Sequence, residues 1–294
     1  MVRLILLFVL LVATPAWAGT ALRVVTTLPD LADWVRQIGG VRVEVVSLLH
    51  GTEDPHTYES QVSDVKALAG ARVLVEVGLG LEEWVSGLVE NARNSQLLVV
   101  EAGDGLALEQ PGEGQVDGAH HPRGNPHVWL DPANAARMCA RIAATLEVAD
   151  PPGGAFYQQN LKAYQERLAA AAAAIRERVQ RLDDRRFISY HPAWPYFARA
   201  LGFEVAAVVT SIPGQEPSAR RVAELVKQVR GQNLRVLVTE PQLPSEIPDL
   251  LAEETGIAVV TLSPIVGSGP AQDYLGQLQA NADTLLRALG APLR

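Results

Sequence analysis

The hydrophobic residues of the first half of the chain fall into short apolar runs separated by stretches with helical spacing. Four runs rich in Val and Leu predict buried β-strands at 22–28, 41–49, 72–78 and 96–102. Between them, apolar residues three and four positions apart predict helices at 31–38, 62–71 and 84–91. Strands that alternate with helices in this rhythm are typical of a parallel α/β layer.

One helix is predicted to be much longer than the others. Between residues 156 and 182 the large apolar side chains recur at three- and four-residue steps: Tyr157, Leu161, Tyr164, Leu168, Ile175, Val179 and Leu182. An alanine run at 169–174 fills the middle of this stretch with the strongest helix former. Such a helix is roughly 40 Å long, which is enough to cross a molecule and tie two lobes together.

After the long helix the alternation resumes. Strands are predicted at 185–190, 203–210, 234–240 and 257–262, and helices at 193–202, 217–233, 245–256 and 274–289. We therefore expect an α/β fold of two lobes, each a mostly parallel sheet with flanking helices, joined by one long backbone helix. The expected divisions are 19–150 for the first lobe, 151–183 for the connecting helix and 184–294 for the second lobe.

The first eighteen residues have the pattern of a cleaved secretory signal peptide. Arg3 precedes a continuous apolar run from Leu4 to Val12, and Ala16-Trp17-Ala18 offers a cleavage site of the small-x-small type. The run is too short to anchor the chain in a membrane. The residue directly after the cleavage site is Gly19 and not Cys, so lipid attachment there is excluded. We expect a free periplasmic protein that begins at Gly19.

Charge and cysteine content narrow the possible functions. The 294-residue chain has a formal net charge of −8, which argues against nucleic acid as a partner because such binding depends on cationic contacts to phosphates. Cys139 is the only cysteine, so no intrachain disulfide can form, and its helical surroundings favour a buried apolar role. The acidic, Gly-rich stretch 103–124 lacks periodicity and predicts a mobile surface loop.

Three of the six histidines supply the candidate chemistry. His56, His127 and His191 each stand beside a proline, in loops or at the carboxyl end of a predicted strand. Ligands of open α/β sheets bind outside the carboxyl ends of the strands, so a site at the lobe junction would gather all three. Imidazole suits Zn²⁺, and proline restrains the neighbouring backbone. Spacing alone is not a motif, and isolated loop histidines are commonly surface residues.

The histidines stand in three longer stretches: DPHTYESQVSDVKAL, NPHVWLDPANA and ISYHPAWPYFARALGF. These resemble, in order, the metal-ligand motifs of the periplasmic solute-binding proteins of zinc and manganese ABC transporters, and the resemblance covers essentially the whole chain after the leader. It implies that His56, His127 and His191 hold one metal ion between two lobes. It also implies a monomer that delivers the ion to an inner-membrane permease and ATPase, with a periplasmic zinc metallochaperone as a further partner to consider.

The resemblance leaves the fourth ligand open. The family usually has an Asp before the proline of its last strand motif, whereas this chain has Ser263, a poor zinc ligand, in TLSPIV. The fourth ligand is then a water, Glu240 or a carboxylate from a loop. Glu240 has a second interpretation, as a carboxylate that orients a ligand histidine without binding the metal. Three nitrogen donors favour Zn²⁺ over Mn²⁺, which prefers carboxylate oxygen. In the acidic loop, His120 and His121 are either a weak zinc tether or solvated side chains.

Two other functions fit the same residues. Three histidines with an open water position are also the arrangement of catalytic zinc, so a zinc hydrolase with Glu240 as general base is one alternative. A manganese or general divalent-metal binding protein is the other. The chain has no GxSxG, P-loop, HExxH or strand-linked GxGxxG sequence. We therefore expect a transport protein that captures Zn²⁺ and carries out no catalysis.

Overall fold

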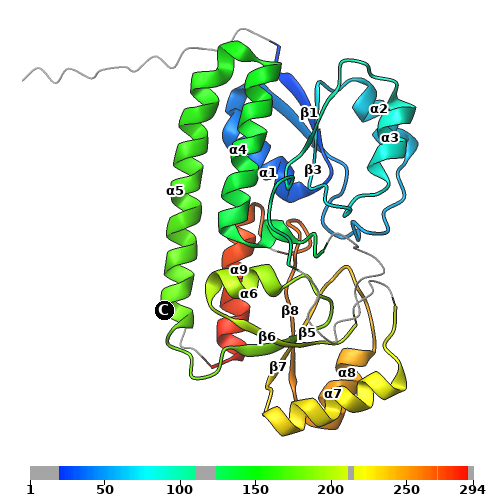
Figure 1. Cartoon of the computed structure of the whole chain (residues 1–294), viewed down its shortest axis with the longest axis vertical. Helices are drawn as coiled ribbons and strands as arrows, with labels where there is room; N and C mark the ends of the chain where they lie inside the picture. The colour runs from blue at the N-terminus through cyan, green and yellow to red at the C-terminus, as the bar shows by residue number, and fades with distance from the viewer. Residues whose placement is uncertain (1–19, 110–123, 211–214, 270, 291–294) are drawn as a thin grey trace, which may run out of the picture.

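The computed structural model describes residues 20–109, 124–210, 215–269 and 271–290. Over these ranges the chain forms two α/β lobes stacked along one long helix, α5 (Gly154–Val179), as Figure 1 shows. The expected signal peptide and most of the expected acidic loop, with His120 and His121, lie outside the described residues. None of the described helices is both long and apolar enough to cross a membrane.

The first lobe is built on a four-stranded parallel sheet with the strand order β2-β1-β3-β4. Its strands are β1 (Leu22–Thr26), β2 (Val43–Ser47), β3 (Val73–Glu76) and β4 (Leu98–Glu101). Its helices are α1 (Pro29–Gly39), α2 (Val62–Ala69), α3 (Val85–Ala92) and α4 (Pro132–Ala149), with single 3-10 turns η1 (Gly40–Arg42), η2 (Val128–Leu130) and η3 (Pro151–Gly153). The predicted strands and helices are all present, and the central strands β1 and β3 are mostly buried, which explains their continuous apolar runs.

The second lobe repeats the topology of the first. Its parallel sheet has the order β6-β5-β7-β8, so in both sheets the lobe's second strand comes first, followed by its first, third and fourth strands. The strands are β5 (Arg186–Ser189), β6 (Glu204–Val208), β7 (Val236–Thr239) and β8 (Ala258–Thr261). The helices are α6 (Pro195–Leu201), α7 (Ala219–Gln232), α8 (Ile247–Thr255) and α9 (Tyr274–Ala288).

Helix α5 joins the lobes through its apolar stripe. The stripe consists of the buried residues Tyr157, Leu161, Tyr164, Leu168, Ala172, Ile175 and Val179, close to the predicted set. It packs on α1 and α4 of the first lobe and on α6 and α9 of the second. One hydrophobic core therefore runs through both lobes, and a smaller one lies beneath α7 and α8. Cys139 is buried in the shared core, as its helical setting predicted.

Two carboxylates of α1 fasten the first lobe to the second. Asp30 accepts the backbone N–H of Val266 at 3.0 Å, and Asp33 accepts that of Tyr274 at 3.0 Å. Burial raises the pKa of Asp30 to about 7, and it also raises the pKa of Asp33. The carboxyl edge of the first sheet, where α1 begins, therefore faces the second lobe.

Two glycines allow the backbones of the lobes to touch at the same junction. Gly51 has φ +105° and Gly267 has φ +103°, conformations that favour glycine. A Cβ on Gly51 would lie 2.3 Å from the carbonyl oxygen of Val266, and one on Gly267 would lie 2.4 Å from that of His50. The loop after β2 and the loop after β8 thus meet without room for side chains between them.

Candidate metal centre

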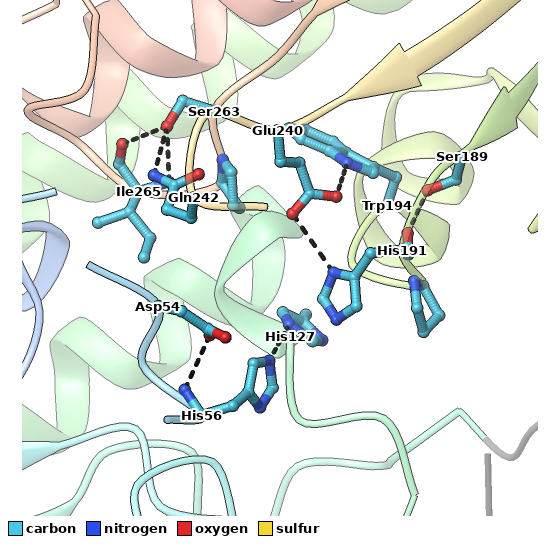
Figure 2. Close-up of polar contacts among 12 residues, drawn as sticks. Asp54, His56, His127, Ser189, His191, Trp194, Glu240, Gln242, Ser263 and Ile265 are labelled. Atoms are coloured by element: carbon cyan, nitrogen blue, oxygen red, sulfur yellow. Dashed lines mark hydrogen bonds and ion pairs between the residues drawn. The ribbon is translucent and has the colours of Figure 1, made fainter. Parts of the chain in front are cut away.

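His56, His127 and His191 converge at the lobe junction, as Figure 2 shows. One ring nitrogen from each lies within 4.8 Å of the others, and the ring centroids are 4.8 to 5.5 Å apart. His127 and His191 are each only 3% exposed, and His56 is half-buried. Within the described ranges this is the single cluster whose side chains have metal-ligating geometry.

Each histidine is held by a short polar side chain two positions earlier in the chain. These residues are Asp54, Asn125 and Ser189. The first two accept the backbone N–H of His56 and of His127, each at 3.0 Å, in the Asx turns that such side chains favour. Ser189 instead donates its hydroxyl to the carbonyl of His191. The proline-bearing loops are therefore fixed by local hydrogen bonds.

The hydrogen bonds of Asn125 determine which nitrogen of His127 carries the proton. Its Oδ1 accepts a backbone N–H and its Nδ2 donates to the carbonyl of Pro192 at 2.7 Å, so the amide has only one possible orientation. The same Oδ1 lies 2.7 Å from Nδ1 of His127. Nδ1 must therefore be the protonated nitrogen, and the lone pair of Nε2 can bind a metal ion.

His56 and His127 meet through their Nε2 atoms, which are 3.2 Å apart. Two lone pairs repel at this distance, so the contact is favourable when one Nε2 carries a proton or when both bind one cation. An ion bound by both imidazoles takes the place of that proton. The pair is thus suited to exchange a proton for a metal ion.

His191 faces a buried carboxylate from the second lobe. Its Nδ1 lies 3.3 Å from Oε2 of Glu240, and Glu240 is itself held by the indole N–H of Trp194 at 3.0 Å. Glu240 is 4% exposed. The carboxylate therefore sits behind the ring, and Nε2 of His191 is left to face the other imidazoles in Figure 2.

Ser263 takes no part in this convergence. Its hydroxyl donates to the carbonyl of Ile265 at 2.7 Å and contacts the hydroxyl of Ser268, so it is turned toward its own loop (Figure 2). Gln242 donates to Ser263 Oγ at 3.3 Å and to the carbonyl of Gly51 at 2.6 Å, across the lobe junction. Ser263, at the position where the family usually has Asp, therefore stabilises its own loop.

Asp54 places a second carboxylate beside the histidines, from the first lobe. It accepts the hydroxyl of Thr57 at 3.2 Å in addition to the N–H of His56. Burial raises the pKa of Asp54 above its usual value, although the hydrogen bond from the backbone N–H of His56 lowers it in part. Two carboxylates from opposite lobes thus flank the three imidazoles. Asp54 and Asn125 were not predicted as site residues, although an Asx residue two positions before each histidine was an available sequence signal.

Two tryptophans close the site from the protein interior. The ring of Trp129 lies 5.2 Å from that of His127, and its indole N–H donates to the carbonyl of Pro264 at 2.9 Å. Trp129 is 1% exposed and Trp194 is fully buried. These side chains keep water from the inner face of His127 and from Glu240.

Comparisons with known proteins find similarity over most of the chain. The family model for ZnuA, the periplasmic component A of the zinc-uptake complex, matches residues 24–288. The high-affinity zinc uptake system protein ZnuA of Bacillus subtilis (strain 168) is 28% identical over 282 residues, which cover 92% of this chain and 88% of the relative. The manganese-binding lipoprotein MntA of Halalkalibacterium halodurans is also 28% identical, over 279 residues that cover 92% of this chain and 89% of the relative.

A solved structure resembles the whole described fold. The crystal structure of a ZnuA protein matches with a TM-score of 0.82 and 29% identity, over 92% of this chain and 100% of the other. The likeness therefore extends to both lobes and the helix between them.

Proposed function

The chain belongs to the ZnuA family of periplasmic zinc-uptake components, and from this membership we propose that its cargo is Zn²⁺, held by His56, His127 and His191. It is a metal-binding transport protein of the type that serves ABC uptake systems. The observation that carries the assignment of ligands is the convergence of three ring nitrogens within 4.8 Å at the lobe junction.

The choice of ion rests on the donor atoms. Three imidazole nitrogens suit Zn²⁺, whereas Mn²⁺ prefers more carboxylate oxygen. A manganese-binding relative is as similar to this chain as the zinc-uptake relative is, so identity does not decide between the ions. The donor set does favour zinc.

The fourth coordination position is proposed to hold an exchangeable water. Glu240 contacts the far nitrogen of His191, and Ser263 is hydrogen-bonded within its own loop. Glu240 is therefore assigned to orientation of the ring and not to ligation. Asp54 and Glu240 together carry two negative charges beside the ligands, which offset the two positive charges of the ion.

The biological setting follows from the family. ABC uptake systems combine a binding protein with a permease and an ATPase, and we propose that a monomer of this chain delivers the ion to such a pair. We further propose that residues 1–18 are removed as a signal peptide, which releases the two-lobed protein into the periplasm. In this view residues 19–150 and 184–294 form the lobes, and 151–183 connect them.

Elemental analysis tests the cargo and the ligands together. Purified residues 19–294, exposed to equimolar Zn²⁺, Mn²⁺ and Ni²⁺ and then desalted, should retain one zinc per chain. The triple variant His56→Ala, His127→Ala, His191→Ala should retain none, while His50→Ala should bind as the parent does, because His50 is exposed and lies outside the cluster. Retention of manganese or nickel in preference to zinc, or zinc that survives the triple substitution, would refute the assignment.

A further inference from the structure

Asn125 touches both lobes with the same amide that holds His127. We propose that Asn125 is a positioning residue. It couples the contact between the lobes to the Nδ1-protonated tautomer of His127, in which Nε2 can bind the ion. This inference rests on the proposed function, since it concerns how one of the three proposed ligands is kept ready for the ion.

The side chain of Asn125 spans the distance between two of the proposed ligands. Its Oδ1 accepts from the backbone N–H of His127 at 3.0 Å and from ring Nδ1 at 2.7 Å. Its Nδ2 donates to the carbonyl of Pro192 at 2.7 Å, and Pro192 directly follows His191. One amide group therefore links a histidine of the first lobe to the segment that carries the histidine of the second.

The backbone of Asn125 is held from both lobes as well. Its carbonyl accepts the hydroxyl of Tyr196, a buried residue of α6, at 2.7 Å. The same hydroxyl accepts the N–H of Glu109 at 2.8 Å, and the N–H of Asn125 donates to the carbonyl of Glu109 at 3.0 Å. Asn125 is consequently unable to move with one lobe without breaking bonds to the other.

The described side-chain hydrogen bonds of Asp54 and Ser189, which hold the other two histidines, stay within one lobe. Asp54 contacts His56 and Thr57 of its own loop, and Ser189 contacts the carbonyl of His191. Separation of the lobes would break the bond from Asn125 to Pro192 and leave the amide held only by the two bonds that its Oδ1 accepts from His127. The acceptor of the Nδ1 proton would then be less firmly held, and with it the tautomer that leaves Nε2 with a lone pair. Opening of the junction would thereby weaken His127 as a metal ligand.

Three variants separate these contributions. Asn125→Ala removes all three side-chain bonds, Asn125→Asp keeps the acceptor for Nδ1, and Tyr196→Phe loosens Asn125 without touching His127. In metal-free protein, ¹⁵N NMR of the histidine rings should show Nδ1-protonated His127 in the parent and in Asn125→Asp, and a mixture of tautomers in Asn125→Ala. Zinc release into excess chelator should be about tenfold to a hundredfold faster in Asn125→Ala and several-fold faster in Tyr196→Phe.

The matched control is Asn94→Ala. Asn94 donates through Nδ2 to the carbonyls of Leu68 and Ala71, all within the first lobe, so its loss should leave zinc release and the His127 tautomer unchanged. The inference is overturned if His127 keeps its Nδ1 proton in Asn125→Ala, or if Asn125→Ala and Asn94→Ala release zinc equally fast. If the parent protein binds no zinc, the proposed function fails, while the tautomer measurement on metal-free protein still decides the role of Asn125.

Discussion

At the scale of single residues, the candidate site places a buried carboxylate next to one of the three proposed ligands. Glu240 is almost completely buried, and its oxygens meet Nδ1 of His191 and the indole N–H of Trp194. A buried carboxylate in contact with a ligand ring fixes the ring and makes its other nitrogen a stronger donor. The role of Glu240 is therefore separable from ligation by a substitution that keeps its shape.

The substitution Glu240→Gln should weaken zinc binding by about tenfold or more without preventing it. The amide retains an oxygen for the indole N–H of Trp194 but loses the charge that faces His191. Competition titration against a chelator of known affinity would measure the change. Glu246→Gln, an equal loss of charge at an exposed position of the same lobe, should bind zinc as the parent does. Complete loss of binding in Glu240→Gln would instead make Glu240 a ligand.

At the scale of elements, the strands and helices were predictable and the contacts between them were not. The apolar runs of the central strands β3, β5 and β7 reflect their burial, and the stripe of α5 has the helical period. The position of His191 after β5 also followed from the sequence. In contrast, the bond from Asn125 to Pro192 joins segments that only the fold brings together. The turned-away hydroxyl of Ser263 likewise depends on the path of its own loop.

The neighbouring strands β3 and β4 bring two like charges side by side at their carboxyl ends. Glu76 and Glu101 are paired in register, and the buried Glu82 lies close by, held by the N–H groups of Val77 and Gly78. Burial raises the pKa of Glu76 to about 8, and the charges of Glu82 and Glu101 add to the rise. The folded protein therefore keeps a proton on Glu76 that the unfolded chain loses near pH 4.5.

This pair of pKa values predicts a pH-dependent effect of Glu76→Gln. Between about pH 4.5 and 8 the folded state binds more protons than the unfolded state, so the parent loses stability as the pH rises. The variant lacks this loss, and its free energy of unfolding should exceed that of the parent by on the order of 2 kcal/mol at pH 9 and match it near pH 4. Urea unfolding at a series of pH values measures the difference. An exposed control, Glu90→Gln, should show no such trend, and parallel curves for Glu76→Gln and the parent would contradict the prediction.

At the scale of the whole molecule, the lobes are joined by more than the connecting helix. The carboxylates of Asp30 and Asp33 hold backbone groups of the second lobe, and Gly51 and Gly267 let the backbones of the two lobes touch. One hydrophobic core also runs through both lobes. An ion bound by His56 and His191 adds a further link between them, so its binding should stabilise the entire fold and not one lobe.

Zinc at about a hundredfold excess over its dissociation constant should raise the midpoint of thermal unfolding by roughly 5–10 °C. Differential scanning calorimetry should show one transition before and after zinc is added, because both lobes share the core and the ion. The triple histidine variant should show no shift. The effect should shrink below about pH 6, since a ligating imidazole must be neutral. A shift confined to one of two separate transitions would mean that the ion is held by a single lobe.

The unbroken α5 has a consequence for how a transporter recognises a loaded carrier. A helix of 26 residues that contacts both lobes resists bending, since a bend must break hydrogen bonds along its length. Empty and filled carriers should then have nearly the same outline. What a docking permease senses must be fine detail at the mouth of the site: a loop displaced by a few ångströms, or two units of positive charge newly seated beneath the surface.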